Sequence, residues 1–407
     1  MDYYKIALLG NKDHGKSTLL GSLLMETGSV SQARINEAKR VSAELGRPFE
    51  PGFILDSFSE EREQAMTFDT TRAQLSYRGK GLEFIDVPGH EELMSSMLSG
   101  ASYADTAVLL VSAARGEGVT PQTKRHVFIA KLFGVRTLIV AVNKMDTVNY
   151  SVNEFQRVVN ELSPFLEKIG FAREVLKYVP ISAYHKENLS RRSSLMEWYQ
   201  GPTLLEVLSE IERSTTLVAE PTQIRVFVQG QITASDVFGG KLLSGELVKD
   251  AILKDPVDGA EFKVNELWVG GKPRSQAHSG ESVALKFSGN INGDLAGRVL
   301  CDTRHGCRSL KEIDATLFVL REPRGALTLS RMGWKTSVSG LQVHSVTDTA
   351  TGERVESDRL LGLQAASVTL YLRSPSVFEP FSKVGELGRF ALYDQEGLVA
   401  AGVVADS

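Results

Sequence analysis

Cysteine is scarce in this chain of 407 residues, which contains only Cys301 and Cys307. So few thiols exclude a small disulfide-rich secreted scaffold and are typical of a protein from a reducing compartment. His305 lies between the two cysteines, so three candidate metal ligands fall close together, but no fourth lies nearby in the sequence. We therefore expect two ordinary thiols rather than a zinc site.

Long apolar runs are missing as well. No stretch approaches the roughly 18 consecutive apolar residues of a membrane-spanning helix. The first five residues lead into a strand-like run without the basic and then apolar segments of a secretion signal. We therefore expect a cytoplasmic protein that does not enter a membrane.

Charge of one sign is not in excess, because 46 Lys and Arg residues stand against 50 Asp and Glu residues, a formal charge of −4. This balance neither predicts nor excludes a nucleic-acid partner, since a basic patch on one face is compatible with it. Apolar residues make up 42% of the chain, which is enough for hydrophobic cores and argues against global disorder.

The first half of the chain alternates short apolar runs with longer helix-like segments. We expect strands at residues 4–9, 81–87, 106–111, 136–142 and 178–181. Helices are expected at residues 16–26, 91–99, 121–133, 151–169 and 203–213. This alternation predicts an α/β domain at residues 1–218, with a mostly parallel sheet covered by helices on both faces.

The pattern changes near Glu220 and Pro221, beyond which short alternating runs are broken by glycine-containing turns. We expect strands at residues 223–231, 245–253, 282–286, 315–320, 336–346, 366–372, 389–392 and 399–404. Strands at such spacing predict β-barrels or sandwiches. The length suffices for two small barrels, which we place at residues 219–311 and 312–407.

A phosphate-binding loop is indicated by residues 10–17, which match the pattern G-x-x-x-x-G-K-[ST] between an expected strand and an expected helix. The glycines let backbone N–H groups point at phosphate oxygens, and the helix N-terminus adds positive potential. Lys16 would bring its charge to the β- and γ-phosphates, and the Ser17 hydroxyl would bind Mg²⁺. The predicted phosphate contacts are Asn11, Lys12, Asp13, His14, Gly15, Lys16, Ser17 and Thr18.

Two further strand ends supply groups of the same kind. Asp86 follows the apolar run 82–85 of the strand expected at 81–87, where its carboxylate can reach the magnesium ion through water. Gly89, three residues later, can offer its backbone N–H to the γ-phosphate. This short pattern is weak by itself, but it follows the phosphate loop in chain order.

The base is indicated by residues 143–146, Asn-Lys-Met-Asp, at the end of the strand expected at 136–142. The Asp146 carboxylate can accept hydrogen bonds from the ring N–H and the amine of guanine, which adenine cannot offer, so the pairing discriminates between the bases. The Lys144 stem can pack over the base, and a backbone N–H of the following strand end can contact the guanine oxygen. The predicted base contacts are Asn143, Lys144, Asp146, Ser182, Ala183 and Tyr184.

Together these motifs resemble the translational-type GTPases, the family of elongation factor 1-alpha, elongation factor Tu and the GTPase subunit of two-subunit ATP sulfurylase. The resemblance covers nearly the whole chain and is strongest at residues 61–64, 67–69, 86–91, 100–102, 142–146, 198–205, 385–391 and 400–404. It implies a P-loop GTPase domain followed by two all-β barrel domains, GTP or GDP with Mg²⁺ as ligands, and a free chain that is a monomer.

The resemblance also implies roles for single residues. Thr67 matches the threonine that binds Mg²⁺ together with Ser17 and Asp86, and His90 matches the histidine that orients the attacking water. With Lys16, these two are the expected catalytic residues, since phosphoryl transfer depends on positioning and charge. Asp13 matches an aspartate that in relatives helps to hold a monovalent cation.

Three departures from the family pattern bear on function. Lys12 replaces a small apolar residue, so its ammonium can supply charge at the γ-phosphate, disturb the screen around the histidine, or point into solvent. Ala65 and Met66 replace the usual Gly-Ile before the threonine. Residues 234–242 lack the glycine-rich pattern of factors that carry tRNA, which puts delivery of aminoacyl-tRNA in doubt without excluding it.

The interpretation we favour is a GTP-driven switch that acts on the ribosome with tRNA or with a decoding factor that mimics tRNA. The alternatives are the regulatory GTPase of an ATP sulfurylase, which needs a separate catalytic subunit, and a GTP-binding scaffold with little turnover. An ATP-dependent kinase or ATPase is disfavoured by Asn143 and Asp146.

Overall fold

The computed structural model describes residues 3–44, 46–55, 71–86, 93–94, 104–212, 223–232, 236–288, 294–304 and 307–406. The chain divides into two compact units, Met1–Arg213 with Thr349–Glu353, and Ser214–Asp348 with Arg354–Ser407. Within the described ranges, no helix has both the length and the apolar character that crossing a membrane requires.

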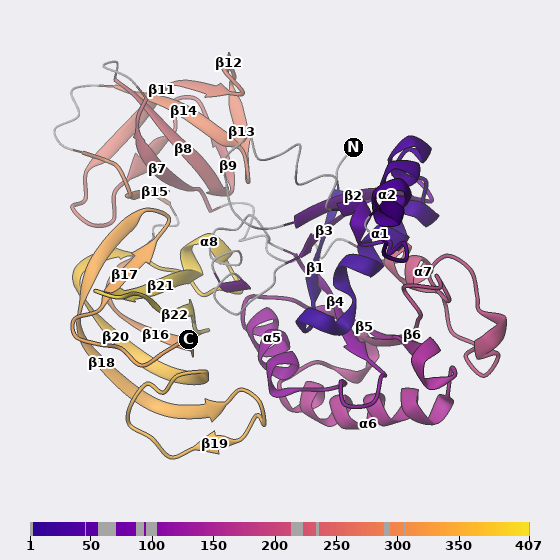
Figure 1. Ribbon diagram of the computed structural model, residues 1–407. Helices are drawn as coiled ribbons and strands as arrows, with labels where there is room; N and C mark the ends of the chain where they lie inside the picture. The colour runs from indigo at the N-terminus through magenta and orange to yellow at the C-terminus, as the bar shows by residue number, and fades with distance from the viewer. Residues whose placement is uncertain are drawn as a thin grey trace. The chain divides into compact units, whose positions relative to one another are not determined.

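The first unit is an α/β domain (Figure 1). Its strands are β1 Tyr3–Leu9, β2 Thr71–Tyr77, β3 Lys80–Asp86, β4 Thr106–Ser112, β5 Thr137–Asn143 and β6 Leu176–Pro180. Its helices are α1 Lys16–Glu26, α2 Gln32–Glu44, α5 Pro121–Leu132, α6 Val152–Lys168 and α7 Leu204–Ser209. The sheet has the order β2-β3-β1-β4-β5-β6. Every adjacent pair is parallel except β2–β3, which confirms the mostly parallel sheet.

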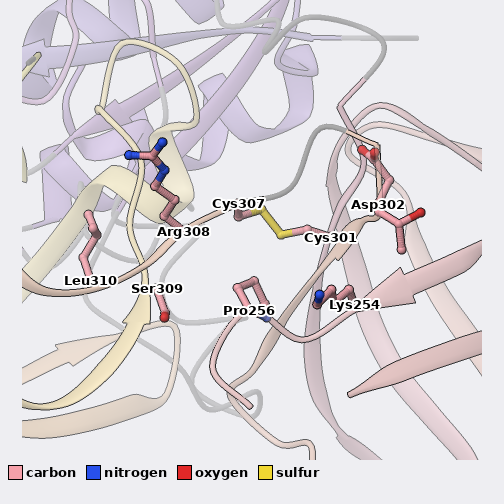
Figure 2. A pocket seen from close by; sticks show the side chains of 9 residues that line it. Lys254, Pro256, Cys301, Asp302, Cys307, Arg308, Ser309 and Leu310 are labelled. Carbon is pink, nitrogen blue, oxygen red and sulfur yellow. A yellow bond between two sulfur atoms is a disulfide. The ribbon is translucent and has the colours of Figure 1, made fainter. Parts of the chain in front are cut away.

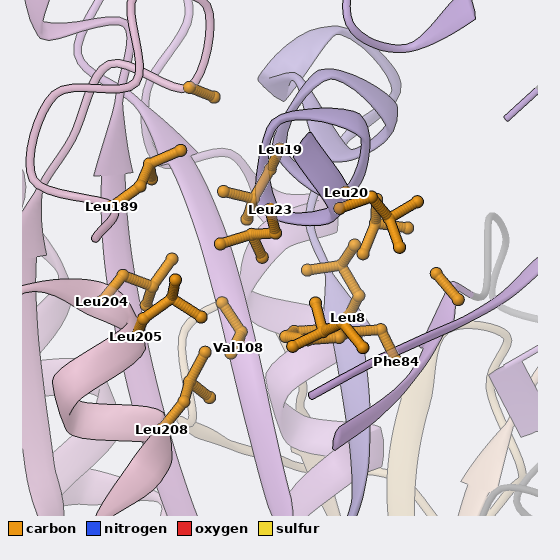
Figure 3. Packing of buried hydrophobic residues seen from close by; sticks show 14 of the residues in the cluster. Leu8, Leu19, Leu20, Leu23, Phe84, Val108, Leu189, Leu204, Leu205 and Leu208 are labelled. Carbon is orange, nitrogen blue, oxygen red and sulfur yellow. The ribbon is translucent and has the colours of Figure 1, made fainter. Parts of the chain in front are cut away.

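Both faces of this sheet are covered. On one face, β1, β3 and β4 pack against α1, α2 and α7, through the cluster that includes Leu8, Leu23, Phe84, Val108 and Leu205 (Figure 3). Helices α5 and α6 lie on the opposite face (Figure 1). The central strands β4 and β5 are buried along almost their whole length, and most of their side chains are apolar, as parallel strands covered on both faces require.

Some elements differ from the expectation. Helix α7 ends at Ser209, short of the predicted residue 213. Helix α2 and strand β2 were not predicted, because only Ile35, Ala38 and Ser42 are buried on α2 and β2 is an antiparallel edge strand. The helix expected at 91–99 falls mostly outside the described residues.

Among the described residues, the second unit contains two seven-stranded antiparallel sheets and one small two-stranded sheet (Figure 1). The first is built from β7 Arg225–Gln231, β8 Val237–Ser244, β10 Ile252–Lys254, β11 Glu261–Val269, β12 Lys272–Pro273, β14 Ser282–Phe287 and β15 Val299–Asp302, with β9 Glu246–Val248 and β13 Gln276–His278 paired beside it. The second is built from β16 Ser309–Val319, β17 Thr328–Arg331, β18 Trp334–Asp348, β19 Arg354–Val355, β20 Gln364–Val377, β21 Arg389–Asp394 and β22 Gly397–Val404, with the short helix α8 Gly385–Gly388.

Both sheets close on themselves. The pairing of β10 with β11 closes the first, and the pairing of β17 with β18 closes the second. The predicted class, an α/β domain followed by two all-β barrels, is therefore confirmed. The strand expected at 245–253 is wrong in detail, because Asp250 adopts a φ of 67° and a turn separates β9 from β10. Strand β16 begins at Ser309, three residues before the predicted limit of the last domain. The domain limits themselves stay predictions.

The two barrels of this unit share buried contacts. Phe227, Val299 and Cys301 of the first barrel cluster with Val377 and Leu387 of the second. The same junction contains an ion pair between Arg225 and Glu379, whose side chains are 7% and 14% exposed. Lys241 and Glu386 form a second, more exposed pair at 3.1 Å.

The cysteines correct an expectation. Cys301 in β15 and Cys307, two residues before β16, form a disulfide with Cα atoms 6.1 Å apart. The expectation of two free thiols was therefore wrong. The two cysteines are six residues apart along the connection from β15 to β16, and the scarcity of cysteine in the chain says little about whether two such neighbours pair. The third candidate ligand, His305, lies outside the described residues.

Candidate functional site

The predicted site residues gather at one edge of the α/β sheet. Strands β1, β3, β4, β5 and β6 run parallel, so their carboxyl ends meet at the same edge. The phosphate loop follows β1, Asp86 ends β3, Asn143 ends β5, and Ser182 comes two residues after β6. Ligands of open α/β sheets bind at this edge.

The phosphate loop needs its two glycines. Gly10 and Gly15 have φ values of 146° and 88°, which side chains rarely adopt. A Cβ on Gly10 would lie 2.8 Å from the Leu110 carbonyl oxygen, and a Cβ on Gly15 would lie 2.7 Å from Nδ2 of Asn143. The loop can therefore lie close to β4 and β5 only with glycine at these two positions.

Lys16 begins helix α1 and is buried inside the loop. Its Nζ donates to the carbonyl oxygens of Gly10 at 2.8 Å and Asn11 at 3.2 Å. Burial lowers the pKa of Lys16, while the charges of Asp86 and Asp13 act to raise it. These two carbonyl oxygens hold the ammonium group at the loop. A phosphate oxygen carries negative charge and would be a stronger acceptor for it.

His14 is buried in the same loop, where Nδ1 donates to the Leu110 carbonyl oxygen at 3.0 Å. Burial lowers the pKa of His14 below its ordinary 6.5, although the hydrogen bond to Leu110 acts to raise it. The neutral ring is therefore the form that packs between the loop and β4.

This histidine predicts a pH dependence. Below pH 6.5 the unfolded chain binds a proton that the folded chain resists, so the free energy of unfolding should fall as the pH drops from 6.5 toward the lower folded pKa. A His14→Gln variant keeps a donor for the Leu110 carbonyl and should lose this component. The measurement is urea unfolding at several pH values, followed by the fluorescence of Trp198 in a chain whose other two tryptophans have been replaced. Exposed His278, changed to Gln, is the control. If the free energy of unfolding changed equally with pH in the wild-type and His14→Gln chains, His14 would not be the source of this pH dependence.

Asn143 joins the phosphate loop to the base loop, residues 182–184, which follows strand β6. Its Nδ2 donates to the His14 carbonyl oxygen at 2.9 Å, and its Oδ1 accepts from the Ala183 backbone N–H at 2.9 Å. Both atoms of this buried amide are thus used. Ser22 of α1 donates to the Ala183 carbonyl oxygen at 2.6 Å, which ties the base loop to helix α1 as well.

Two side chains of the base motif are oriented by neighbours. The Ser182 hydroxyl donates to Oδ1 of Asp146 at 2.6 Å, which fixes the carboxylate. Lys144 has a φ of 62°, and its ammonium contacts Glu117 at 2.8 Å. Burial raises the pKa of Glu117, but hydrogen bonds from Lys144 and Ser112 outweigh this and lower it. Glu117 therefore holds the Lys144 stem as an anion.

The remaining predicted contacts are placed as follows. Lys12, Asp13, Ser17 and Tyr184 are exposed, and Thr18 is buried. Asp86 lies close enough to Lys16 for its charge to raise the pKa of that lysine. Thr67, Gly89 and His90 lie outside the described residues, so their roles stay predictions.

Residues 46–55 pack against helix α1 next to the phosphate loop. The Thr18 hydroxyl donates to Oε1 of Glu50 at 2.7 Å. A Cβ on Gly21 would overlap the Pro51 carbonyl oxygen, and a Cβ on Gly52 would lie 3.3 Å from Cβ of Ser17. Gly21 therefore leaves room for this segment.

Gly21→Ala should move this segment away from α1. Alanine normally stabilises a helix interior by about 0.5–1 kcal/mol over glycine, but here the methyl group would displace Pro51, so we expect a net loss of about 1–3 kcal/mol. The measurement is the free energy of unfolding together with amide exchange at Phe53 and Leu55, which donate within the segment. Thr18→Val, which removes only the hydrogen bond to Glu50, should lose about 1 kcal/mol. A more stable Gly21→Ala chain would contradict the packing argument.

Sequence reasoning missed several supporting residues. Glu50 lies 32 residues from Thr18, and Glu117 lies 27 residues from Lys144. Thr120, the N-cap of α5, accepts from the Asn11 amide at 2.6 Å. Glu117 and Thr120 follow β4, the one strand of this edge to which no role was given. A search for polar residues after every parallel strand would have found both.

The chain is similar to known GTPases along its whole length. Residues 1–214 match the model of the elongation factor Tu GTP binding domain, and residues 327–405 match that of the GTP-eEF1A C-terminal domain-like family. An elongation factor 1-alpha of Archaeoglobus fulgidus is 31% identical, over 100% of this chain and 98% of the relative. The same protein of Natronomonas pharaonis is 33% identical, over 99% and 97%.

A solved structure of Sup35 complexed with GDP covers 100% of this chain and 94% of that chain, with 23% identity and a TM-score of 0.41. The family resemblance predicted from the motifs is confirmed by the family models and by the full-length relatives. The GTP-binding model alone matches more than half of the chain. The chain therefore belongs to the translational GTPases, the family of the elongation factor Tu GTP binding domain and elongation factor 1-alpha, and it is a GTPase.

Proposed function

We propose that this GTPase is a magnesium-dependent switch of translation, which acts in the cytoplasm on the ribosome with tRNA or with a protein that mimics tRNA. The observation that carries the proposal is the base loop, where Ser182 fixes Asp146 and Asn143 joins the loop to the phosphate loop. The elongation factors with which this chain aligns from end to end support the ribosomal partner.

The chain's own residues divide the work of binding. Asp146 reads the guanine edge, and the Lys144 stem, held by Glu117, lies over the base. Lys16 exchanges its carbonyl acceptors for oxygens of the β- and γ-phosphates, which neutralises charge as the terminal phosphoryl group departs. The N-terminus of α1 adds its own positive potential.

The magnesium ion is proposed from the donors that the site offers. Ser17 is exposed at the start of α1, and Asp86 lies near Lys16, so a hydroxyl and a carboxylate flank the expected phosphates. Such oxygens suit Mg²⁺, which takes its other ligands from phosphates and water, and Thr67 would supply a further oxygen. The ion would neutralise phosphate charge. We extend the proposal to a monovalent cation near Asp13.

Hydrolysis itself is assigned to residues 67 and 90 by the family pattern. His90 would orient the attacking water, and Thr67 would hold the γ-phosphate side of the site. Lys12, whose side chain is exposed at the loop, would add charge in the transition state. A Lys12→Val chain with unchanged GTP affinity and unchanged single-turnover rate would remove Lys12 from this mechanism.

The experiment is GTP and ATP turnover by the purified chain, with and without ribosomes, beside a His90→Ala chain. We expect turnover of GTP alone, acceleration by ribosomes, and loss of the acceleration in His90→Ala with GTP affinity retained. Equal rates with and without ribosomes would overturn the ribosomal partner. Binding without hydrolysis under every condition would overturn the switch and favour a scaffold.

The relatives reported above are elongation factors, which does not favour the alternative of a sulfurylase regulator. The choice between tRNA and a tRNA-mimicking protein depends on the first barrel. There Gly240 of β8 packs against β7, since a Cβ would lie 2.6 Å from the Phe227 carbonyl oxygen, so this glycine serves the barrel. A filter-binding assay with aminoacyl-tRNA and the GTP-loaded chain distinguishes the two partners. If the partner is a protein that mimics tRNA, the chain should retain no tRNA on the filter.

A further inference from the structure

A cavity of about 490 Å³ lies in the second unit. Both residues of the disulfide line it, together with Lys254 and Arg308 (Figure 2). A cavity of this size holds a small organic molecule. The chemistry of its wall is therefore a disulfide between two cationic side chains.

The two sulfurs differ in access. Cys301 is 1% exposed, in the cluster between the barrels, whereas Cys307 is only partly buried. An incoming thiolate therefore meets Sγ of Cys307 first. This makes Cys301 the leaving group, and a leaving thiolate departs faster when its environment stabilises negative charge.

The cation placed to do this is Lys254, which lines the same cavity as Cys301. It pairs with Cys301 across the β10–β15 ladder, and directly paired residues of antiparallel strands project on the same face. Arg225 pairs with Cys301 on the other side, but its charge is engaged by Glu379. In the part of the chain that the structure describes, neither Lys254 nor Arg308 makes an ion pair.

One carboxylate also lines the cavity, that of Asp302. Its Oδ2 accepts from the Ile224 backbone N–H at 3.0 Å, and its Oδ1 accepts from that of Arg304 at 2.9 Å. Two backbone N–H groups thus partly compensate the negative charge of Asp302. With two cations and this one engaged anion, the cavity wall favours an anionic ligand.

We propose that Cys301–Cys307 is an exchangeable disulfide, opened by a small anionic thiol that enters this cavity. The thiolate attacks Sγ of Cys307, which forms a mixed disulfide and expels the Cys301 thiolate beside Lys254. A second thiolate attacks the sulfur of the bound thiol and releases the Cys307 thiolate. Two protons from the two thiols end on the cysteines, so two thiols become one disulfide while the protein disulfide becomes two thiols.

The test compares three thiols of similar size and different charge on the oxidised full chain. These are 2-mercaptoethanesulfonate, 2-mercaptoethanol and cysteamine, each rate being corrected for the thiolate fraction and divided by the rate on a small model disulfide. We expect the anionic thiol to open the disulfide about tenfold faster than the cationic one at low salt, with the difference shrinking at high salt. Intact mass and peptide mapping after alkylation should find the first adduct on Cys307.

Matched variants separate a built site from simple exposure. Lys254→Gln should reduce the tenfold preference to about threefold or less. Lys263→Gln removes the same charge from β11, the strand next to β10, where Lys263 forms an ion pair with Asp250. This variant should leave the preference for the anionic thiol unchanged. Equal rates for the three thiols, an adduct on Cys301, or a chain that stays reduced after treatment with an oxidised thiol would each overturn the proposal. None of these readouts depends on GTP.

Discussion

A chain carrying Asp146→Asn should lose GTP affinity by about 100-fold or more and gain affinity for xanthosine triphosphate. The wild-type carboxylate accepts from two guanine donors, and a site built on paired hydrogen bonds strongly rejects a ligand that leaves a group unpaired. The asparagine amide offers one acceptor and one donor, which matches the ring N–H and the carbonyl oxygen of xanthine. Its oxygen can still accept from Ser182, so the loop should stay in place.

The measurement is competitive binding of GTP, xanthosine triphosphate and ATP to the wild-type and Asp146→Asn chains. Ser182→Ala is the matched control, because it removes the partner that orients Asp146 at 2.6 Å but keeps the carboxylate. We expect it to weaken GTP about tenfold without a change of preference. If Asp146→Asn weakened all three nucleotides equally, Asp146 would be a structural residue rather than the reader of the base.

The second large effect is expected at the junction of the two barrels. Arg225→Met should destabilise the second unit by about 3 kcal/mol, since it leaves the Glu379 carboxylate buried without its counter-ion. Arg225 also donates to Oε1 of Gln223 at 2.7 Å, so its removal breaks this hydrogen bond as well. The double variant Arg225→Met with Glu379→Met should regain most of the loss, because no unpaired charge then remains.

Lys241 provides the comparison. Its pair with Glu386 joins the same two barrels, but the side chains are 34% and 28% exposed, so Lys241→Met should lose less than about 1 kcal/mol. Urea unfolding followed by Trp268 and Trp334, one in each barrel, measures both variants. If Arg225→Met and Lys241→Met lost the same free energy of unfolding, burial would not determine how much these ion pairs stabilise the second unit.

Local signals predicted much of the nucleotide-binding unit. The bounds of α1 were predicted to the residue, because the phosphate loop determines its start and the apolar face ends with Glu26. The strand ends that present Asp86 and Asn143 followed from apolar runs bounded by polar residues. In these cases, residues adjacent in sequence determine the structure.

Long-range contacts could not be predicted in this way. Arg225 and Glu379 are 154 residues apart, and nothing near either residue signals that both are buried. Other elements were missed although their partners are near in sequence. The cysteines are only six residues apart, and strand β2 pairs with the following strand β3 in a hairpin, but its sequence TRAQLSY contains no apolar run. The burial of the Arg225–Glu379 pair results from the packing of the two barrels against one another and not from local propensity.

The Asn143 amide also limits how the enzyme can be re-engineered. Because its donor side serves the His14 carbonyl and its acceptor side serves the Ala183 N–H, aspartate cannot replace it despite having the same shape. Any redesign of the base loop that shifts residue 183 would pull on the phosphate loop through this one side chain. A programme to alter nucleotide preference should therefore treat the two loops as a single module and confine its changes to the base-reading position.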